Sequence, residues 1–256
     1  MRILEGIAAA FSMFSAIPVP QGRGRELDMR YLLPAFPLVG TVIGALSGIA
    51  AYLCFLWRLP DVLRGLVLTL IPVIITGGIH LDGYADTCDA LASLKDIDGR
   101  HGILKDPHIG TFAVIRLCMY FATVFTLWCV LPEYPYINII LMYALSRVLS
   151  GLSVVSFSLY GGAGLAHMLA ASADKNKIRA VLIFFDLILL AFFVSQGYPG
   201  AVMAAAAHIV FAVYHHICKK SFGGLSGDLC GWFLCKCELW MLVSLTALQL
   251  FEEVLK

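Results

Sequence analysis

The feature that most restricts the fold of this chain is a series of long apolar runs separated by short polar segments. Hydrophobic residues make up 60% of the 256 residues and charged residues only 14%, and the mean hydropathy is +0.87. A soluble domain carries about 25% charged residues, and a helix needs about 20 apolar residues to cross a bilayer. We therefore predict an all-α, polytopic integral membrane bundle, organised as one catalytic domain over residues 1–256.

About seven transmembrane helices are predicted from these runs, preceded by a short N-terminal helix. Residues 1–17 are borderline in length for a span, so we expect an interfacial or short membrane helix there. Gly40, Gly44 and Gly48 recur every four residues in the first span, which favours close helix packing. The predicted spans are 32–57, 63–79, 111–131, 136–160, 179–196, 200–217 and 230–251.

Positive charges divide unequally when these spans are threaded through a bilayer. The three on one side are Arg58, Arg64 and Lys256. The eleven on the other side are Arg23, Arg25, Arg30, Lys95, Arg100, Lys105, Lys175, Lys177, Arg179, Lys219 and Lys220. Such an excess marks cytoplasmic loops, so we expect a multi-pass protein of the plasma (inner) membrane with loops 18–31, 80–110, 161–178 and 218–229 in the cytoplasm. The net charge of +1 excludes a general nucleic-acid surface.

One acidic stretch, TGGIHLDGYADTCD from Thr76 to Asp89, stands out in this apolar chain. On a helix, Asp82, Asp86 and Asp89 fall within roughly 60° of one another, because each residue advances by about 100°. Like charges this close repel, and a divalent cation such as Mg²⁺ or Mn²⁺ would turn the repulsion into attraction. Gly77 and Gly78 would let a phosphate or metal approach the backbone. His80 precedes the carboxylates.

Two other polar segments carry residues suited to phosphate or metal. Lys105-Asp106-Pro107-His108-Ile109-Gly110-Thr111 places a lysine beside a predicted helix start, which is a ready anion site. Gly223-Gly-Leu-Ser-Gly227-Asp228 sets glycines before an aspartate, with Glu238 ten residues after Asp228. Taken alone, Lys105 is also compatible with an interfacial lysine that snorkels, and the glycine-rich segment with a flexible turn.

Several ionisable residues fall inside predicted spans, where a charge costs a few kcal/mol or more. Arg116 and Arg147 would suit a deep anionic substrate pocket, or would pair structurally with Asp186 or Glu238. Together with the loops they indicate Mg²⁺-dependent phosphoryl chemistry. The chain has no GxxxxGK[ST] motif, so it is not a P-loop enzyme.

These segments resemble cobalamin synthase, the adenosylcobinamide-GDP ribazoletransferase family. The resemblance rests on GGIHLDGYADTCDA at 77–90, ILKDPHIGTFAV at 103–114, ALSR at 144–147 and GGLSGDLCG at 223–231. FSAIPVP at 14–20 and FPLVGTVIG at 36–44 also fit. Ala90 and His108 depart from the residues common in the family.

The resemblance implies the assembly of the nucleotide loop of cobalamin. The 3′-hydroxyl of α-ribazole, or of its 5′-phosphate, attacks the phosphorus on the cobinamide side of adenosylcobinamide-GDP, and GMP leaves. It implies a Mg²⁺ site of Asp82, Asp86, Asp89 and Asp228, with Lys105 stabilising the leaving group. His80 is the candidate for deprotonating the hydroxyl, and Asp82 the alternative. The residues that it places at the substrates are Gly77, Gly78, Lys105, Asp106, His108, Gly110, Arg116, Arg147, Gly227 and Glu238.

Corrinoid and nucleoside substrates, the lipid bilayer and other cobalamin-assembly enzymes are the expected partners, and the oligomeric state is left open. Two alternatives were weighed. A CDP-alcohol phosphotransferase also sets aspartates around a metal, but its motif continues DGxxAR, whereas Thr87 and Cys88 follow here. A transporter or channel would spread polar residues along the spans, whereas here they gather at one end.

Overall fold

A computed structural model describes residues 2–19, 29–132, 135–162, 164–171 and 174–255. Arg23, Arg25 and Lys256, which entered the charge count, lie outside this range. Within it, eleven α-helices and one 3-10 helix account for the regular structure. They are α1 (Arg2–Phe14), η1 (Met29–Tyr31), α2 (Leu32–Leu56), α3 (Asp61–Thr76), α4 (Ile79–Ala92), α5 (Ile97–Leu104), α6 (Thr111–Val130), α7 (Tyr136–Ser156), α8 (Leu165–Ala171), α9 (Lys175–Ser195), α10 (Gly197–Phe222) and α11 (Gly227–Leu255).

Six of these helices are long and apolar enough to cross a membrane, namely α2, α6, α7, α9, α10 and α11. The predicted all-α, polytopic membrane bundle is thereby confirmed. Helices α3 and α4 pass the same test only as a pair, and the pair is bent by 96°. Helix α1 has 13 residues, which is too few to span a bilayer.

The bend between α3 and α4 corrects the predicted span 63–79. Helix α3 ends at Thr76, because Gly77 and Gly78 both have positive φ angles, 64° and 81°. Glycine adopts this left-handed region readily, whereas a side chain would strain it. Helix α4 begins here at 96° to α3 and packs against α6 and α11. Because α4 carries three aspartates among its 14 residues, we place it outside the membrane-spanning segments.

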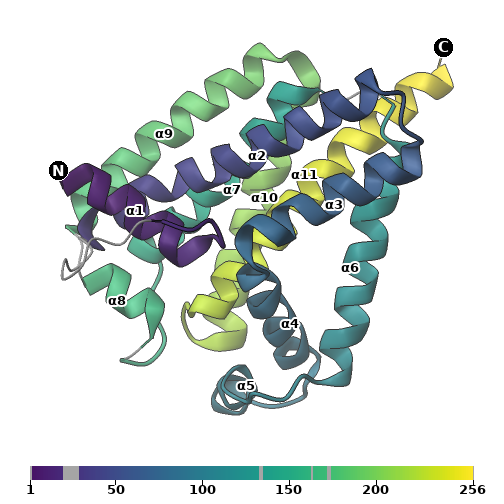
Figure 1. Ribbon diagram of the computed structural model, residues 1–256. Coiled ribbons are helices and arrows are strands. Elements are labelled where there is room, and N and C mark those ends of the chain that lie inside the picture. Colours follow the sequence, from purple (N-terminus) through teal and green to yellow (C-terminus); the bar gives the residue numbers. More distant parts are fainter. Residues whose placement is uncertain (1, 20–28, 133–134, 163, 172–173, 256) are drawn as a thin grey trace.

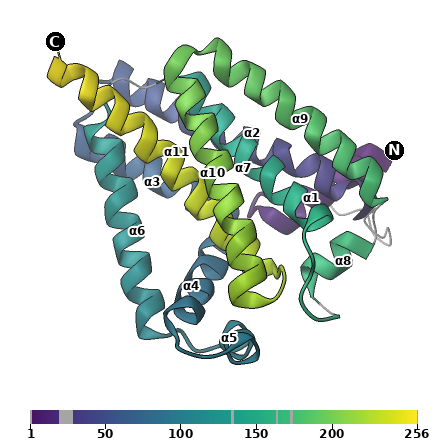
Figure 2. The same cartoon turned by 180° about the vertical axis from the view of Figure 1, so that it is seen from behind.

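Helix α7 is the centre of the bundle and packs against α2, α9, α10 and α11 (Figures 1 and 2). It is nearly buried along its whole length, whereas α6 and α9 are mostly exposed. A Cβ atom on Gly40 or Gly44 of α2 would collide with the α7 backbone at Tyr143 or Ile140. The predicted packing role of these two glycines is confirmed, and Gly48 lies further from α7.

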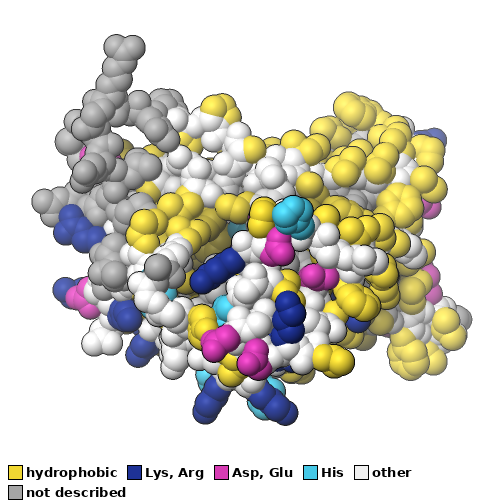
Figure 3. All heavy atoms as spheres, turned by 90° about the horizontal axis from the view of Figure 1, so that it is seen from below, with side chains coloured by type: hydrophobic (Ala, Val, Ile, Leu, Met, Phe, Trp, Pro, Cys, Tyr) yellow, Lys and Arg dark blue, Asp and Glu magenta, His cyan; other side chains and the backbone are white. Residues whose placement is uncertain are grey.

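The short helices and polar loops gather at one end of the bundle. Helices α4, α5 and α8 lie there together with the turn between α10 and α11, far from the end of α11 at the C-terminus (Figures 1 and 2). Viewed toward this end, acidic, basic and histidine side chains surround a hollow with hydrophobic walls (Figure 3). Segments distant in the sequence therefore meet on one polar face.

Candidate functional site

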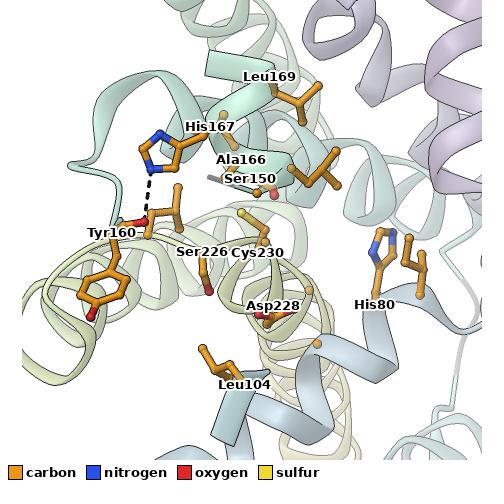
Figure 4. A pocket seen from close by; sticks show the side chains of 18 of the residues that line it. His80, Leu104, Ser150, Tyr160, Ala166, His167, Leu169, Ser226, Asp228 and Cys230 are labelled. Atoms are coloured by element: carbon orange, nitrogen blue, oxygen red, sulfur yellow. Dashed lines mark hydrogen bonds between the residues drawn. The ribbon is translucent and has the colours of Figure 1, made fainter. Parts of the chain in front are cut away.

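A cavity of about 610 Å³ opens at this polar end, between α1, α2, α4, α5, α7, α8 and α11. Among the predicted site residues it is lined by His80, Asp82, Lys105, Gly227 and Asp228. These residues come from three separate loops or helix starts (Figure 4). The structure thus brings the acidic stretch, the lysine segment and the glycine-rich segment to one site.

Two glycines allow α4 to lie directly on the first turns of α11. A Cβ atom on Gly83 would approach the carbonyl oxygen of Asp228 to 2.7 Å, and one on Gly231 would approach the carbonyl oxygen of His80 to 2.9 Å. Both distances are shorter than real Cβ contacts, so neither position has room for a side chain. This close approach places Asp82 and Asp228 on the walls of the same cavity.

Helix α4 carries the predicted row of carboxylates. Asp82 is exposed in the cavity, whereas Asp86, one turn further along, is half-buried. Burial, followed by the charges of Asp82, Asp228 and Asp89 in that order, raises the pKa of Asp86 to about 6. The four carboxylates therefore form one electrostatically coupled cluster.

Asp89, at the far end of this row of carboxylates, has different surroundings from Asp82. Asp89 does not line the cavity, and its carboxylate lies against Gly110, the residue that precedes α6. A helix N-terminus favours a negative charge. This position accounts for the absence of a side chain at Gly110, where a Cβ atom would overlap the carboxylate.

The carboxylate cluster fits a hard cation by the chemistry of its donors. Among the described residues, no three His, Cys, Asp or Glu side chains converge closely enough to hold a metal ion. Mg²⁺ is usually bound through one or two carboxylates together with water and substrate phosphates, not by a cage made only of protein. Asp82 and Asp228 on the cavity wall meet that requirement as a pair.

His80 lies in an aromatic part of the cavity wall. Only 8% of its surface is exposed, and its Nε2 atom is buried without a hydrogen-bond partner. The rings of Phe14 and Phe36 lie 6.3 and 6.2 Å from the imidazole. His80 also lines a second, smaller cavity behind the first.

The segment after α5 brings one of its predicted residues to the cavity. Lys105 ends α5 and lines the cavity, with its side chain exposed. Asp106 and His108 do not line it and interact with each other instead. Asp106 accepts a hydrogen bond from the backbone N–H of His108 (3.0 Å) and lies 2.8 Å from the ring Nδ1, and these contacts lower the pKa of Asp106.

The buried arginine of α7 is paired inside the protein. Arg147 is 1% exposed and forms an ion pair with Glu238 of α11, while Ser146 donates a hydrogen bond to the same carboxylate. Both charged residues line the second cavity, of about 40 Å³, and not the first. Arg116 is exposed on α6, and it lines neither cavity, like Gly77 and Gly78. The predicted contacts of these residues with substrate stay predictions.

His101, Tyr160 and His167 are among the cavity residues that the sequence analysis missed. The rings of His101 and Tyr160 are stacked with 3.4 Å between centroids, and the Tyr160 hydroxyl donates to Asp98. Nε2 of His167 lies 3.1 Å from the carbonyl oxygen of Tyr160. The sequence Tyr160-Gly-Gly-Ala-Gly164 was the available signal, since clustered glycines mark close approach of a ligand or another backbone.

Backbone hydrogen bonds join this missed segment to the glycine-rich turn. Tyr160 donates to the carbonyl of Leu225 (3.1 Å), and Leu225 donates to Ser158 (2.8 Å). His101 of α5 contacts the carbonyl of Phe222 through Nε2 (2.8 Å). The segments that contain His101, Tyr160 and Leu225 are thus hydrogen-bonded to one another beside the cavity.

Comparisons with known proteins find similar chains over nearly the whole length of this one. A family model described as cobalamin-5-phosphate synthase matches residues 6–246. A protein of Lachnoclostridium phytofermentans named adenosylcobinamide-GDP ribazoletransferase is 38% identical, over 93% of this chain and 92% of its own. Proteins of the same name from Clostridium perfringens (29% identical, 90% and 92%) and Geobacillus kaustophilus (31%, 89% and 89%) are also similar. No solved structure matches.

Proposed function

The chain belongs to the cobalamin-5-phosphate synthase family, and from this premise we propose that it is an adenosylcobinamide-GDP ribazoletransferase. The 3′-oxygen of α-ribazole, or of its 5′-phosphate, forms a bond to the phosphorus on the cobinamide side of the donor. The bond from that phosphorus to the oxygen of GMP breaks. The products are GMP and adenosylcobalamin, or adenosylcobalamin 5′-phosphate.

One observation connects this function to a site. A single cavity is lined by Asp82, Lys105 and Asp228, which come from three segments. A diphosphate in that cavity would meet carboxylates suited to a metal ion and a lysine suited to the leaving group. Polar residues are concentrated around this cavity at one end of the bundle, as expected for an enzyme and not for a transport pathway along the spans.

We propose Mg²⁺, with Mn²⁺ as a substitute, as the metal of this site. Asp82 and Asp228 would hold it, and Asp86 lies one turn from Asp82 in the same coupled cluster. When bound, Mg²⁺ would neutralise charge on the diphosphate and on the transferred phosphoryl group. The carboxylates of this cluster, which repel one another in its absence, support this proposal.

Lys105 and His80 receive the remaining roles. The flexible side chain of Lys105 would stabilise the negative charge that develops on GMP as it leaves. The proton of the attacking hydroxyl would pass to His80, whose Nε2 is unpartnered. A carboxylate that holds a metal ion is a weaker base than a free one, which favours His80 over Asp82. Burial, and then the charge of Arg147, oppose the charged imidazolium and lower the pKa of His80 to about 3, and bound substrate phosphates would offset that cost.

The chain is a multi-pass membrane protein by the length and apolar character of its helices. We propose that it lies in the plasma (inner) membrane with the cavity facing the cytoplasm, on the basis of the eleven-to-three division of positive charges. A Lys95→Cys variant that also carries Cys118→Ala, because Cys118 is exposed, should be labelled only from the cytoplasmic side. Labelling from the outside would invert this orientation.

The activity can be tested on the full chain purified in detergent. With Mg²⁺, adenosylcobinamide-GDP and α-ribazole, we expect GMP and adenosylcobalamin in equal amounts. A reaction without α-ribazole is the control, because simple hydrolysis of the donor would release GMP there too. Failure to release GMP above that control would contradict the proposed function.

A further inference from the structure

The main cavity has two chemically different ends on either side of Asp228. In Figure 4, His80 lies on one side of Asp228, and Tyr160 and His167 lie on the other. Two substrates must meet at the carboxylates during the proposed reaction. The two ends can therefore be assigned to them by comparing chemistry.

The end at His80, which we call the aromatic end, is formed by Phe14, Leu33, Phe36, Ile79 and His80. Phe14 of α1 and Phe36 of α2 are 8% and 3% exposed, and their ring centroids are 4.3 Å apart. With the imidazole of His80 they present aromatic surfaces from three helices. Among these five residues, only His80 has a side chain with atoms that can donate or accept hydrogen bonds.

The aromatic end is held in place by the backbone. The chain that follows α1 is fixed to the end of α3, since the N–H of Ala16 donates to the carbonyl of Ile75 (2.7 Å). Phe14 is thereby kept beside the bend from which His80 and Asp82 emerge. A ligand at the aromatic end thus adjoins the start of the acidic helix.

The opposite end, which we call the polar end, offers hydrogen-bonding groups and a positive charge. It contains Tyr160, His167, Ser226 and Lys105, together with Gly161, Gly162 and Gly164. These groups suit phosphate oxygens and a polar nucleobase. A nucleobase with several donors and acceptors would lose hydrogen bonds to water at the aromatic end, which costs free energy.

Resting on the proposed function, we propose that the aromatic end binds the flat, apolar benzimidazole base of α-ribazole. The guanosine diphosphate part of the donor then occupies the polar end. The benzimidazole base packs against these aromatic side chains and loses little hydrogen bonding to water. Its ribose extends toward Asp82, which brings the attacking hydroxyl to the carboxylates and beside His80. The two substrates thus approach the reacting phosphorus from opposite ends.

The test is steady-state kinetics of Phe14→Ala and Phe36→Ala, with each substrate varied in turn. We expect the KM for α-ribazole to rise about tenfold, as for the loss of stacking on one base. The KM for adenosylcobinamide-GDP should change by less than about twofold, because the guanine base of this substrate does not stack on Phe14 or Phe36. Phe11→Ala is the matched control, because Phe11 is a partly buried residue of α1 that does not line the cavity.

A second measurement follows binding without turnover, and it uses a leucine variant so that it does not rely on the folding of the alanine variants. Phe36→Leu keeps an apolar side chain but removes the ring, and equilibrium dialysis with α-ribazole alone should show weaker binding. In the unmodified protein, a riboside of unmethylated benzimidazole should be a better acceptor than a riboside of a purine.

The outcomes separate this inference from the proposed function. If the unmodified protein releases no GMP, the proposed function fails. If it is active and the variants raise the KM of adenosylcobinamide-GDP instead, or leave both KM values and α-ribazole binding unchanged, only the assignment of the aromatic end is overturned.

Discussion

Gly83 in α4 lies against the backbone of Asp228 at the start of α11, at a distance that leaves no room for a Cβ atom. Asp82 and Asp228 belong to segments far apart in the sequence, and this contact is what places them in one cavity. The catalytic arrangement thus depends on a residue that has no side chain.

Gly83→Ala should therefore reduce activity without removing a functional group. In an ordinary helix this change stabilises by about 0.5–1 kcal/mol. Here α4 must move away from α11, and a displacement of about 1 Å can cost about 100-fold in rate. GMP release should fall accordingly, while Gly102→Ala in α5, where nothing lies within 4 Å of a new Cβ, should leave the rate unchanged. A fully active Gly83→Ala would show that the contact is not needed.

Asp82→Asn and Asp228→Asn should each lower kcat/KM by at least about 100-fold, because each would remove a charged ligand of the proposed metal. Both variants should also need more Mg²⁺ for half-maximal activity, measured by titration after treatment with a chelator. Asp174→Asn, at an exposed helix start, is the control. Full activity of the unmodified protein in excess chelator would rule out the metal.

Lys105→Ala should lower kcat by about 10²–10³-fold, the usual effect of removing one group that stabilises developing charge. Lys105→Arg should recover part of the rate, because the charge is kept while its geometry changes. Lys95→Ala removes an exposed lysine that does not line the cavity and should behave as the unmodified protein. Equal effects at the two lysines would indicate only general attraction of the anionic donor.

His80→Gln should lower kcat by about 10²–10⁴-fold if His80 accepts the proton of the attacking hydroxyl. Replacing the solvent with D₂O should then slow the unmodified enzyme more than the variant, since proton transfer contributes to its rate. His216→Gln, at an exposed position of α10, is the control. A His80→Gln enzyme with normal kcat would assign the proton to Asp82.

The Arg147–Glu238 pair should matter for stability more than for substrate binding. Arg147→Met leaves a mostly buried carboxylate unpaired and should cost about 3–5 kcal/mol. The double variant with Glu238→Met should recover much of that loss, since no buried charge remains. Unfolding in detergent measures both. If the double variant is stable but its KM for adenosylcobinamide-GDP rises tenfold or more, the arginine contacts substrate after all.

The apolar runs predicted the spanning helices well, because the length of a bilayer-crossing helix is fixed by the membrane. The same pattern extended the second span to residue 79, three residues beyond the observed end of α3. The positive φ angles of Gly77 and Gly78 end α3 at Thr76 and turn the chain by 96°, and their predicted contact with a phosphate stays a prediction. A glycine pair in the sequence does not reveal whether it serves a ligand or a bend.

The candidate site was predicted in its charged part and missed in its aromatic part. Carboxylates and a lysine are conspicuous in an apolar chain, so Asp82, Lys105 and Asp228 were found. Phe14 and Phe36 lie within apolar runs, where a side chain that faces a cavity looks the same as one that faces lipid. The sequence offered Asp186 and Glu238 as structural partners for its buried arginines, and the packing of α7 on α11 pairs Arg147 with Glu238.

Helix α1 contributes Phe14 to the cavity, whereas α11 ends at the opposite side of the bundle (Figure 1). This difference between the two ends bears on how the protein is handled in the laboratory. An affinity tag or a fluorescent fusion should be joined after Lys256, because a bulky group before α1 would sit close to a helix that forms part of the substrate wall.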